Sequence, residues 1–558
     1  MWWPDYDGTA NLSDTGQGFV YGTINLLDAD GEWYLNPATP TLSLRISGGG
    51  SPSGHTVELK RRSWCISIND YDYIIVRGIQ TRGGAILLEG IGNQLVNCDA
   101  RYLSHFLTFK TGFDRYGDQT AGGGVVLGGS NCTVQNCTIS DTAGPAIYSE
   151  GSDHRILRNT ISRSDYAGTF GGAVNLEGER EIVAFNTISN TGRDVIRLAG
   201  TGETVMFNDL SGSGVNCDDV GILYSSWTDS MNITSGKGSR IAYNWVHDGT
   251  GTASHNMGIY LDNGTQNFQV DHNVVWNLSS TGGAAVSING IRLNSPADGH
   301  AVYHNTLFNC DTYNNDTYSN FNPATTPSKY PYWTSATHHL FYTAKNNLVL
   351  TDSGASLENV ASKDFRPKTG TSAVDPTSVS KTATFTATKA GRYLNNAFTY
   401  SCDSSTAFTY LETLGNGLAL AGVNSWVTDG KPDNGAYERG IASWTAGVTG
   451  WDGIKMDSPA VGVRSVTLQG VRIATDLRFT QIRIYYGTSD GGKVATTWSN
   501  TQDLGIATPA DVLTSYRPSL TGLEGGQMYY ARLRATDANG DKWSDVQSFT
   551  TYQSYEGY

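Results

Sequence analysis

Short aliphatic segments, each interrupted by one polar residue, recur along the middle of the chain. The unit reads apolar-x-x-Asn-x-aliphatic, and its copies place the asparagine at Asn159, Asn186, Asn208, Asn244, Asn273, Asn305 and Asn347. Two earlier copies carry Cys98 and Cys137 in the same position. Spacings between copies start at 22 residues, which fits one coil of three short strands with the excess in loops. Stacked asparagine side chains can bond to one another, which offsets the cost of burying amides.

A second strand precedes each of these segments, in AIYSEG, AVNLEG, VIRLAG, GILYSS, GIYLDN and GIRLNS. Alternation predicts one inward aliphatic column of Ile147, Val174, Ile196, Ile222, Ile259 and Ile291. It predicts an outward column of Tyr148, Asn175, Arg197, Leu223, Tyr260 and Arg292. Parallel strands stacked in this way predict an all-β fold, a right-handed parallel β-helix of about ten coils.

The pattern changes after the last asparagine. DFRPKTGTSAVDP (Asp364 to Pro376) and TDGKPDNGAYERG (Thr428 to Gly440) resemble the closing segments of secreted β-helix proteins, which finish the last coils. We therefore expect a β-helix domain over residues 1–440 and a linker over 441–457. Short alternating strands with turn residues between them predict a small β-sandwich over 458–552, followed by a tail over 553–558. LEGGQMYYARLRATDANGDKWS resembles a fibronectin type III domain, with Leu523 and Tyr529 placed as in its tyrosine corner.

Composition agrees with a β-rich protein that has many turns. The 558 residues include 66 Gly, 30 Tyr and 13 Trp, and 16% are charged, with a net charge of −14. The negative charge and the lack of a Lys/Arg cluster argue against nucleic acid or an anionic membrane as partner. No apolar run reaches the ~20 residues of a membrane span, so we expect a soluble chain whose export signal lies outside it.

The seven cysteines are scattered and form no CxxC pair. This pattern indicates neither a zinc site nor a disulfide framework, and no cofactor is expected. Cys98 and Cys137 fit the asparagine stack as small apolar members, and a disulfide between them is the less favoured alternative.

Candidate chemistry lies on the outward side of the predicted coils, because the inward residues are structural. A turn column follows the second strands at Glu150, Glu177, Ala199, Ser225, Asp262 and Asn294. Coils are ~4.8 Å apart, so Glu177 is ~14 Å from Asp262, too far for carboxylates that work at ~5 to 9.5 Å. The partner of Asp262 is therefore expected from the preceding loop, where Asp218 and Asp219 lie. The other expected substrate-binding residues are His255, Tyr260, Tyr224, Trp227, Arg292 and Arg197.

Structural interpretations of the same residues stay open. The Asp262-Asn263-Gly264 sequence is typical of a turn that caps its own backbone. Asp218 and Asp219 could bind backbone amides or a structural Ca²⁺, and Trp227 could pin its own loop.

Two stretches resemble a known group of enzymes. The segment from Gly31 to Ile79, which begins GEWYLNPATPTLSL, is similar to the opening motif and first coil of β-helix glycoside hydrolases of the β-xylosidase and α-fucosidase/xylanase type. GIYLDN resembles their "YLDD" turn. The resemblance covers roughly residues 20–440 and implies an extracellular carbohydrate-active enzyme with two carboxylates. This chain has Asn263 in place of the second Asp, and a shorter region before the opening motif.

Three functions follow from these observations. The first is a secreted or cell-surface glycoside hydrolase that cleaves a plant or algal polysaccharide with Asp262 and one of Asp218 and Asp219. The second is a polysaccharide lyase or epimerase acting on uronates. The third is a non-catalytic adhesin, glycan-binding stalk or self-assembling filament protein. The oligomeric state is left open.

Overall fold

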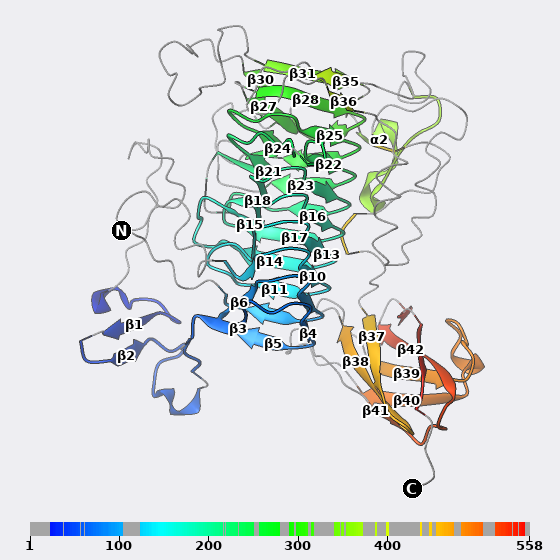
Figure 1. Cartoon of the computed structure of the whole chain (residues 1–558). Coiled ribbons are helices and arrows are strands. Elements are labelled where there is room, and N and C mark those ends of the chain that lie inside the picture. The colour runs from blue at the N-terminus through cyan, green and yellow to red at the C-terminus, as the bar shows by residue number, and fades with distance from the viewer. Residues whose placement is uncertain are drawn as a thin grey trace. The chain divides into compact units, whose positions relative to one another are not determined.

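Three long parallel sheets form the main part of the computed structural model. The structure describes residues 23–36, 38–55, 57–60, 62–103, 123–215, 217, 219–232, 234–249, 256–278, 289–294, 297–310, 314–316, 340–345, 347–350, 353–371, 385–387, 398–400, 436–437, 446–448, 454–473, 481–505, 519–537, 540–544 and 546–552. Each of the three sheets has ten strands within this part of the chain. Successive coils contribute one strand to each sheet, as Figure 1 shows. The prediction of a parallel β-helix of about ten coils is confirmed.

The first sheet contains the predicted strands that precede the asparagine segments. In order it holds β3 (Trp64–Ile68), β6 (Ala85–Leu88), β9 (Val125–Leu127), β12 (Ile147–Ser149), β15 (Gly172–Leu176), β18 (Asp194–Leu198), β21 (Val220–Ser225), β24 (Asn256–Leu261), β27 (Ile291–Asn294) and β30 (Asn314–Asp316). The inward column predicted at Ile147, Val174, Ile196, Ile259 and Ile291 is fully buried. The prediction of Ile222 in this column is wrong, because Leu223 is the residue that pairs with Ile196 and Ile259.

The second and third sheets flank the asparagine positions. The second holds β4 (Ile75–Arg77), β7 (Gln94–Val96), β10 (Thr133–Gln135), β13 (Arg155–Leu157), β16 (Ile182–Ala184), β19 (Thr204–Met206), β22 (Arg240–Ala242), β25 (Gln269–Asp271), β28 (Ala297–Tyr303) and β31 (Leu340–Lys345). The third holds β5 (Gln80–Arg82), β8 (Asp99–Arg101), β11 (Thr138–Ser140), β14 (Thr160–Ser164), β17 (Thr187–Thr191), β20 (Asp209–Ser211), β23 (Trp245–Gly249), β26 (Val274–Leu278), β29 (Thr306–Phe308) and β32 (Leu348–Leu350).

The asparagine stack forms as predicted at the turn between these two sheets. Each side-chain amide donates to the carbonyl oxygen of the next asparagine at 2.8–3.0 Å, from Asn159 through to Asn347. The same oxygen accepts the backbone N–H of the preceding asparagine, as between Asn208 and Asn244. Cys98 and Cys137 are buried and form no disulfide, and the Cys137 N–H donates to Asn159 Oδ1, the first oxygen of the stack.

From Asn159 to Asn305, the residue before each asparagine of the stack has a left-handed backbone, which turns the chain from the second sheet into the third. The φ angles there lie between 52° and 60° at Phe185, Phe207, Tyr243, His272 and His304. Such a conformation is costly for residues other than glycine. The five rings stack with centroids 4.7–5.2 Å apart, which supplies contacts that offset this cost.

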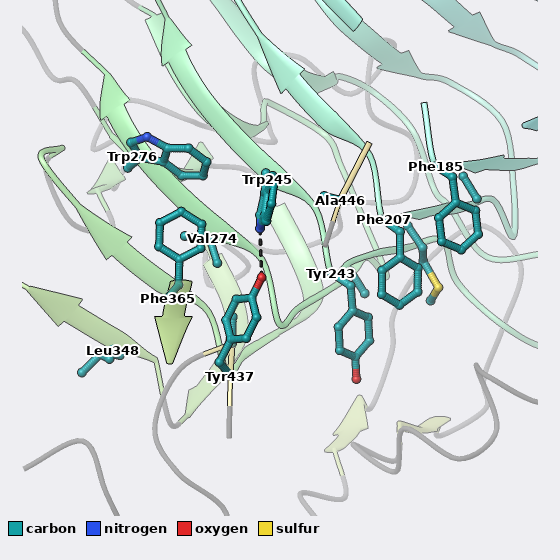
Figure 2. Close-up of a cluster of buried hydrophobic side chains, with 14 of the residues drawn as sticks. Phe185, Phe207, Tyr243, Trp245, Val274, Trp276, Leu348, Phe365, Tyr437 and Ala446 are labelled. Carbon is teal, nitrogen blue, oxygen red and sulfur yellow. Dashed lines mark hydrogen bonds between the residues drawn. The ribbon is translucent and has the colours of Figure 1, made fainter. Parts of the chain in front are cut away.

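Several described residues from beyond the last coil pack against the outer side of earlier coils. Figure 2 shows Phe365 and Tyr437 packed on Trp245 and Trp276, with the Trp245 indole N–H donating to the Tyr437 hydroxyl at 3.0 Å. Ala436 N–H donates to Thr306 Oγ1, and Gly447 N–H donates to Phe207 O. The closing segments therefore contact several coils from outside, rather than only finishing the last one. We call the contacting residues Phe365, Ala436, Tyr437 and Gly447 the clasp, which extends past residue 440.

The other helices and strands that come before Gly447 are short. They are η1 (Ile24–Leu26), β1 (Trp33–Asn36), β2 (Thr41–Leu44), η2 (Pro52–Gly54), α2 (Ser353–Ser356), β33 (Leu357–Asn359), η3 (Val360–Ser362), β34 (Asp364–Pro367), β35 (Phe385–Ala387) and β36 (Phe398–Tyr400). In the described part of the chain, no helix is long and apolar enough to cross a membrane.

The C-terminal unit consists of two antiparallel sheets with one core. One sheet contains, in this order, β37 (Ile454–Val461), β38 (Ser465–Ile473) and β41 (Ser519–Thr521). The other contains β40 (Asn500–Gly505), β39 (Gln481–Gly487), β42 (Met528–Asp537), β43 (Gly540–Trp543) and β44 (Gln547–Thr550), and η4 (Ala495–Thr497) precedes β40. Tyr529 accepts the Glu524 N–H at 3.0 Å beside the buried Leu523. The fibronectin type III assignment stays a prediction.

Candidate functional site

The outward residues of the first sheet form one continuous column across six coils. The strand register pairs Tyr148 with Asn175, and continues through Arg197, Tyr224, Tyr260 and Arg292. All six side chains are buried to 92% or more, although they point away from the solenoid interior. The column combines aromatic rings, cations and an amide on one face.

The register corrects one coil of the sequence alignment. Leu223, predicted outward, pairs with Ile196 and Ile259 in the inward column, and Tyr224 takes the outward position. The turn column changes in the same way. Ser225, predicted at the turn, pairs with Leu261 at the end of the strand, so Ser226 is the residue that corresponds to Asp262 on the next coil. The alignment was wrong at this coil because Ile222 and Leu223 are adjacent and both aliphatic. Period-2 alternation alone does not show which of the two points inward.

Asp262 is held by three hydrogen bonds directly after β24. Tyr224 donates its hydroxyl to Asp262 Oδ2 at 2.9 Å. Asn294 Nδ2 and the Asn263 N–H donate to Asp262 Oδ1, each at 2.7 Å. Only 8% of Asp262 is exposed. The residues therefore fix the carboxylate in one orientation from the coils on both sides.

Trp227 fixes the turn that carries Asp262. Its backbone N–H donates to Asn263 O at 2.7 Å, and its ring lies on Gly264, where any Cβ would overlap the ring. Gly264 has φ +76°, so glycine is required there on two grounds. Trp227 therefore pins the turn that directly follows Asp262. Half of the Trp227 surface is exposed.

Asp219 lies directly before β21, whereas Asp262 lies directly after β24, the neighbouring strand of the next coil. Asp219 is exposed, its φ is +55°, and its carbonyl oxygen accepts from Arg193 Nη2 at 3.1 Å. Burial, then the negative charges of Asp262 and Asp219, raise the pKa of Tyr260 well above its usual value. Both carboxylates thus act electrostatically on the Tyr260 hydroxyl. Asp218 and His255 lie outside the described residues.

Three arginines on this face lie over aromatic rings. Arg193, 2% exposed, lies 4.6 Å from the Phe170 ring centroid and 5.4 Å from that of Tyr224, and it pairs with Asp194 at 3.3 Å. Arg197 lies 5.0 Å from Phe170, and Arg292 lies 5.5 Å from Tyr260. The two predicted arginines are therefore part of the packed face, and Arg193 is a member that the sequence did not single out.

A second carboxylate pair lies further along the same face. The Tyr148 hydroxyl is 3.3 Å from Glu150 Oε2 and 3.2 Å from Glu177 Oε2, so two glutamates on adjacent coils meet at one oxygen. Arg197 pairs with Glu177 at 3.3 Å. These glutamates were in the predicted turn column, but their convergence depends on the Tyr148 ring and was missed.

Two buried glutamates lie just inside the turn column. Burial raises the pKa of Glu181 to about 8 and that of Glu203 well above its usual value. Glu181 bonds to Ser149 Oγ and to the Gly178 N–H, and Gly200 N–H donates to Glu203 at 3.0 Å. The repeated spacing Gly-x-x-Glu, at Gly178 to Glu181 and again at Gly200 to Glu203, was the signal that could have revealed them.

A metal site is not visible in the described residues, where no group of three or more His, Cys, Asp or Glu side chains comes together. The Ca²⁺ alternative at Asp218 and Asp219 stays a prediction, because Asp218 lies outside those residues.

Comparison with known proteins supports the fold. A family model described as a right handed beta helix region matches residues 84–310, the stretch that holds β6 to β29. No curated protein matches the chain. Together with the three parallel sheets, the family match shows that the chain is similar to right-handed parallel β-helix proteins over its central coils.

Proposed function

We propose that this protein is a carbohydrate-active protein and, more specifically, a glycoside hydrolase. Its substrate would bind on the outward face of the first sheet. The observation that carries the proposal is Asp262, a nearly buried carboxylate that is oriented by Tyr224 and Asn294 and is followed by a turn that Trp227 holds. Aromatic rings offer flat faces to sugar rings, and an oriented carboxylate can act as nucleophile or general base.

Hydrolysis of a glycosidic bond needs a second carboxyl group that protonates the leaving oxygen. Asp219 and Asp218 are the proposed sources, because in the sequence they directly precede β21, the strand adjacent to β24, and because the charges of Asp219 and Asp262 both raise the pKa of Tyr260. Tyr260 keeps its proton at neutral pH, since burial and both carboxylates raise its pKa. It can therefore donate a hydrogen bond to a sugar oxygen.

Elimination on a uronate is less well supported. A lyase needs a cation to neutralise the substrate carboxylate. Arg193 and Arg197 already pair with Asp194 and Glu177, at 3.3 Å in each case. The net charge of −14 also disfavours a polyanionic substrate.

The test is a screen of the full chain against plant and algal polysaccharides, read by reducing-sugar release and by absorbance near 232 nm. Asp262→Asn is expected to abolish reducing-sugar release with an unchanged circular dichroism spectrum. Asp99→Asn, on the third sheet, is the matched control and should retain full activity. Retained activity in Asp262→Asn would remove this residue from the mechanism, and absorbance at 232 nm would favour a lyase.

A second candidate is glycan binding without cleavage, on a stalk or filament. Asn263 favours it, because the related enzymes have a second Asp at this position. Binding of a polysaccharide in gel electrophoresis, with no product from any glycan in the screen, would support this alternative.

We further propose that the protein acts outside the cell or at its surface, and that residues 458–552 form a fibronectin type III module that serves as a spacer. The Tyr529 hydroxyl at 3.0 Å from the Glu524 N–H supports the module type, because a tyrosine corner has this bond.

A further inference from the structure

The side-chain carbonyl oxygen of Asn294 is a buried acceptor beside Asp262. Asn294 is 6% exposed, and within the described residues no donor lies in hydrogen-bonding distance of its Oδ1. A buried acceptor with no partner costs free energy, so its retention next to a carboxylate points to a ligand that supplies the donor.

The orientation of this amide is fixed by its neighbours. Asn294 Nδ2 faces three oxygens, at 2.7 Å from Asp262 Oδ1 and at 3.4 Å from both Asn263 Oδ1 and Tyr260 Oη. A reversed amide would set its oxygen against the Asp262 carboxylate. Oδ1 is therefore the atom that faces away from Asp262.

Tyr260 supplies the complementary group. Its hydroxyl oxygen accepts from Asn294 Nδ2, which leaves its O–H to donate to another atom. The ring is held edge-to-face against Tyr224, with centroids 5.3 Å apart, and Arg292 covers it at 5.5 Å. The hydroxyl thus has a fixed position beside Asn294.

We propose that Asn294 Oδ1 and the Tyr260 O–H bind one hydroxyl of a neutral sugar residue, and so select uncharged glycans at the Asp262 site. A sugar hydroxyl both donates and accepts, and it satisfies this pair in one contact. A uronate carboxylate only accepts, so it could take the Tyr260 O–H but would leave Asn294 Oδ1 without a donor and would lie close to the Asp262 carboxylate. This inference rests on the proposed function, and names its substrate class.

The test measures binding by titration calorimetry of the full chain, with the hexasaccharides of xylan, cellulose, mannan and laminarin as neutral probes, and of polygalacturonate and polymannuronate as charged probes. Asn294→Ala and Tyr224→Phe are a matched pair, because each removes one hydrogen bond to Asp262 and only the first removes the free acceptor. We expect Asn294→Ala to weaken binding of the neutral hexasaccharide about 10-fold or more, and Tyr224→Phe less than about 3-fold.

Tyr260→Phe is the second variant and should weaken the same neutral probe, with melting temperatures reported for all three variants. Equal effects of Asn294→Ala and Tyr224→Phe would overturn the inference, as would tighter binding of a uronate probe or no binding of any neutral probe. Binding is read without cleavage. A neutral glycan that binds through Asn294 but is never hydrolysed would therefore remove the hydrolase proposal and leave this one standing.

Discussion

Trp245 and Tyr437 are 192 residues apart in sequence, and the indole N–H of one donates to the hydroxyl of the other at 3.0 Å inside a buried aromatic cluster. This bond ties the closing segment to strand β23. Its environment is apolar, with Phe365 5.8 Å from Trp245 between ring centroids.

Tyr437→Phe should destabilise the β-helix by about 1–3 kcal/mol, because it leaves the buried Trp245 N–H without an acceptor. Chemical unfolding monitored by tryptophan fluorescence measures the change. Tyr71→Phe serves as control, since Tyr71 is 68% exposed, and it should have no effect. Equal stability of Tyr437→Phe and the parent would show that the clasp contributes nothing through this bond.

Stability should fall as pH rises from about 5 to above 8, because of Glu181. Its pKa is about 8 in the folded protein against an ordinary 4.5, so the folded state holds a proton that the unfolded state releases. The stabilisation that comes from the bound proton of Glu181 is complete below about pH 4.5 and is lost as the pH rises past about 8. Glu181→Gln should flatten this slope, and Glu203 retains a part of it because its pKa is raised as well. Urea unfolding at several pH values measures this, with the exposed Glu58→Gln as control.

Asn208→Ala should cost about 2 to 4 kcal/mol, because it interrupts the asparagine stack. Asn208 donates to Val183 O and Asn244 Oδ1 and accepts from Asn186, all buried. Asn208→Cys should cost less, since Cys98 and Cys137 occupy this position in earlier coils. Thermal melts compare the two variants. A cysteine variant as unstable as the alanine variant would mean that the early coils tolerate cysteine for another reason.

Asn263→Asp should raise the rate of glycan hydrolysis by about 10-fold or more if a second carboxylate serves in acid–base chemistry. Asn263 Oδ1 lies 3.4 Å from Asn294 Nδ2, so an aspartate there keeps a hydrogen-bond donor. Initial rates of reducing-sugar release across pH measure the effect. An unchanged rate would show that the turn needs only Asp262.

The asparagine stack could be predicted because its pattern is local and each copy spans only six residues. The register of β21 could not, since alternation does not decide between Ile222 and Leu223, and only pairing with Ile259 settles it. Glu181 was missed for a different reason. A glutamate in a glycine-rich turn normally faces solvent, and its burial depends on how neighbouring coils stack.

The candidate site divides in the same way. The outward positions of Tyr260 and Arg292 followed from period-2 alternation. The bonds from Tyr224 and Asn294 to Asp262 join three different coils, so they depend on coil stacking that a linear pattern does not contain. Arg193 was missed because its contacts with Phe170 and Asp194 depend on side-chain direction.

The clasp also contacts the solenoid at two separate points along its axis. Its contacts attach Ala436 to Thr306 on one coil and Gly447 to Phe207 three coils earlier, about 14 Å away along the axis. A coil inserted between these points would separate them by a further ~4.8 Å, and a deleted coil would bring them closer by the same distance. Repeat proteins commonly change length by gaining or losing units. In this one, the roughly eleven residues from Ala436 to Gly447 could reach ~36 Å when extended, so the same segment could still attach at both points after a coil is gained.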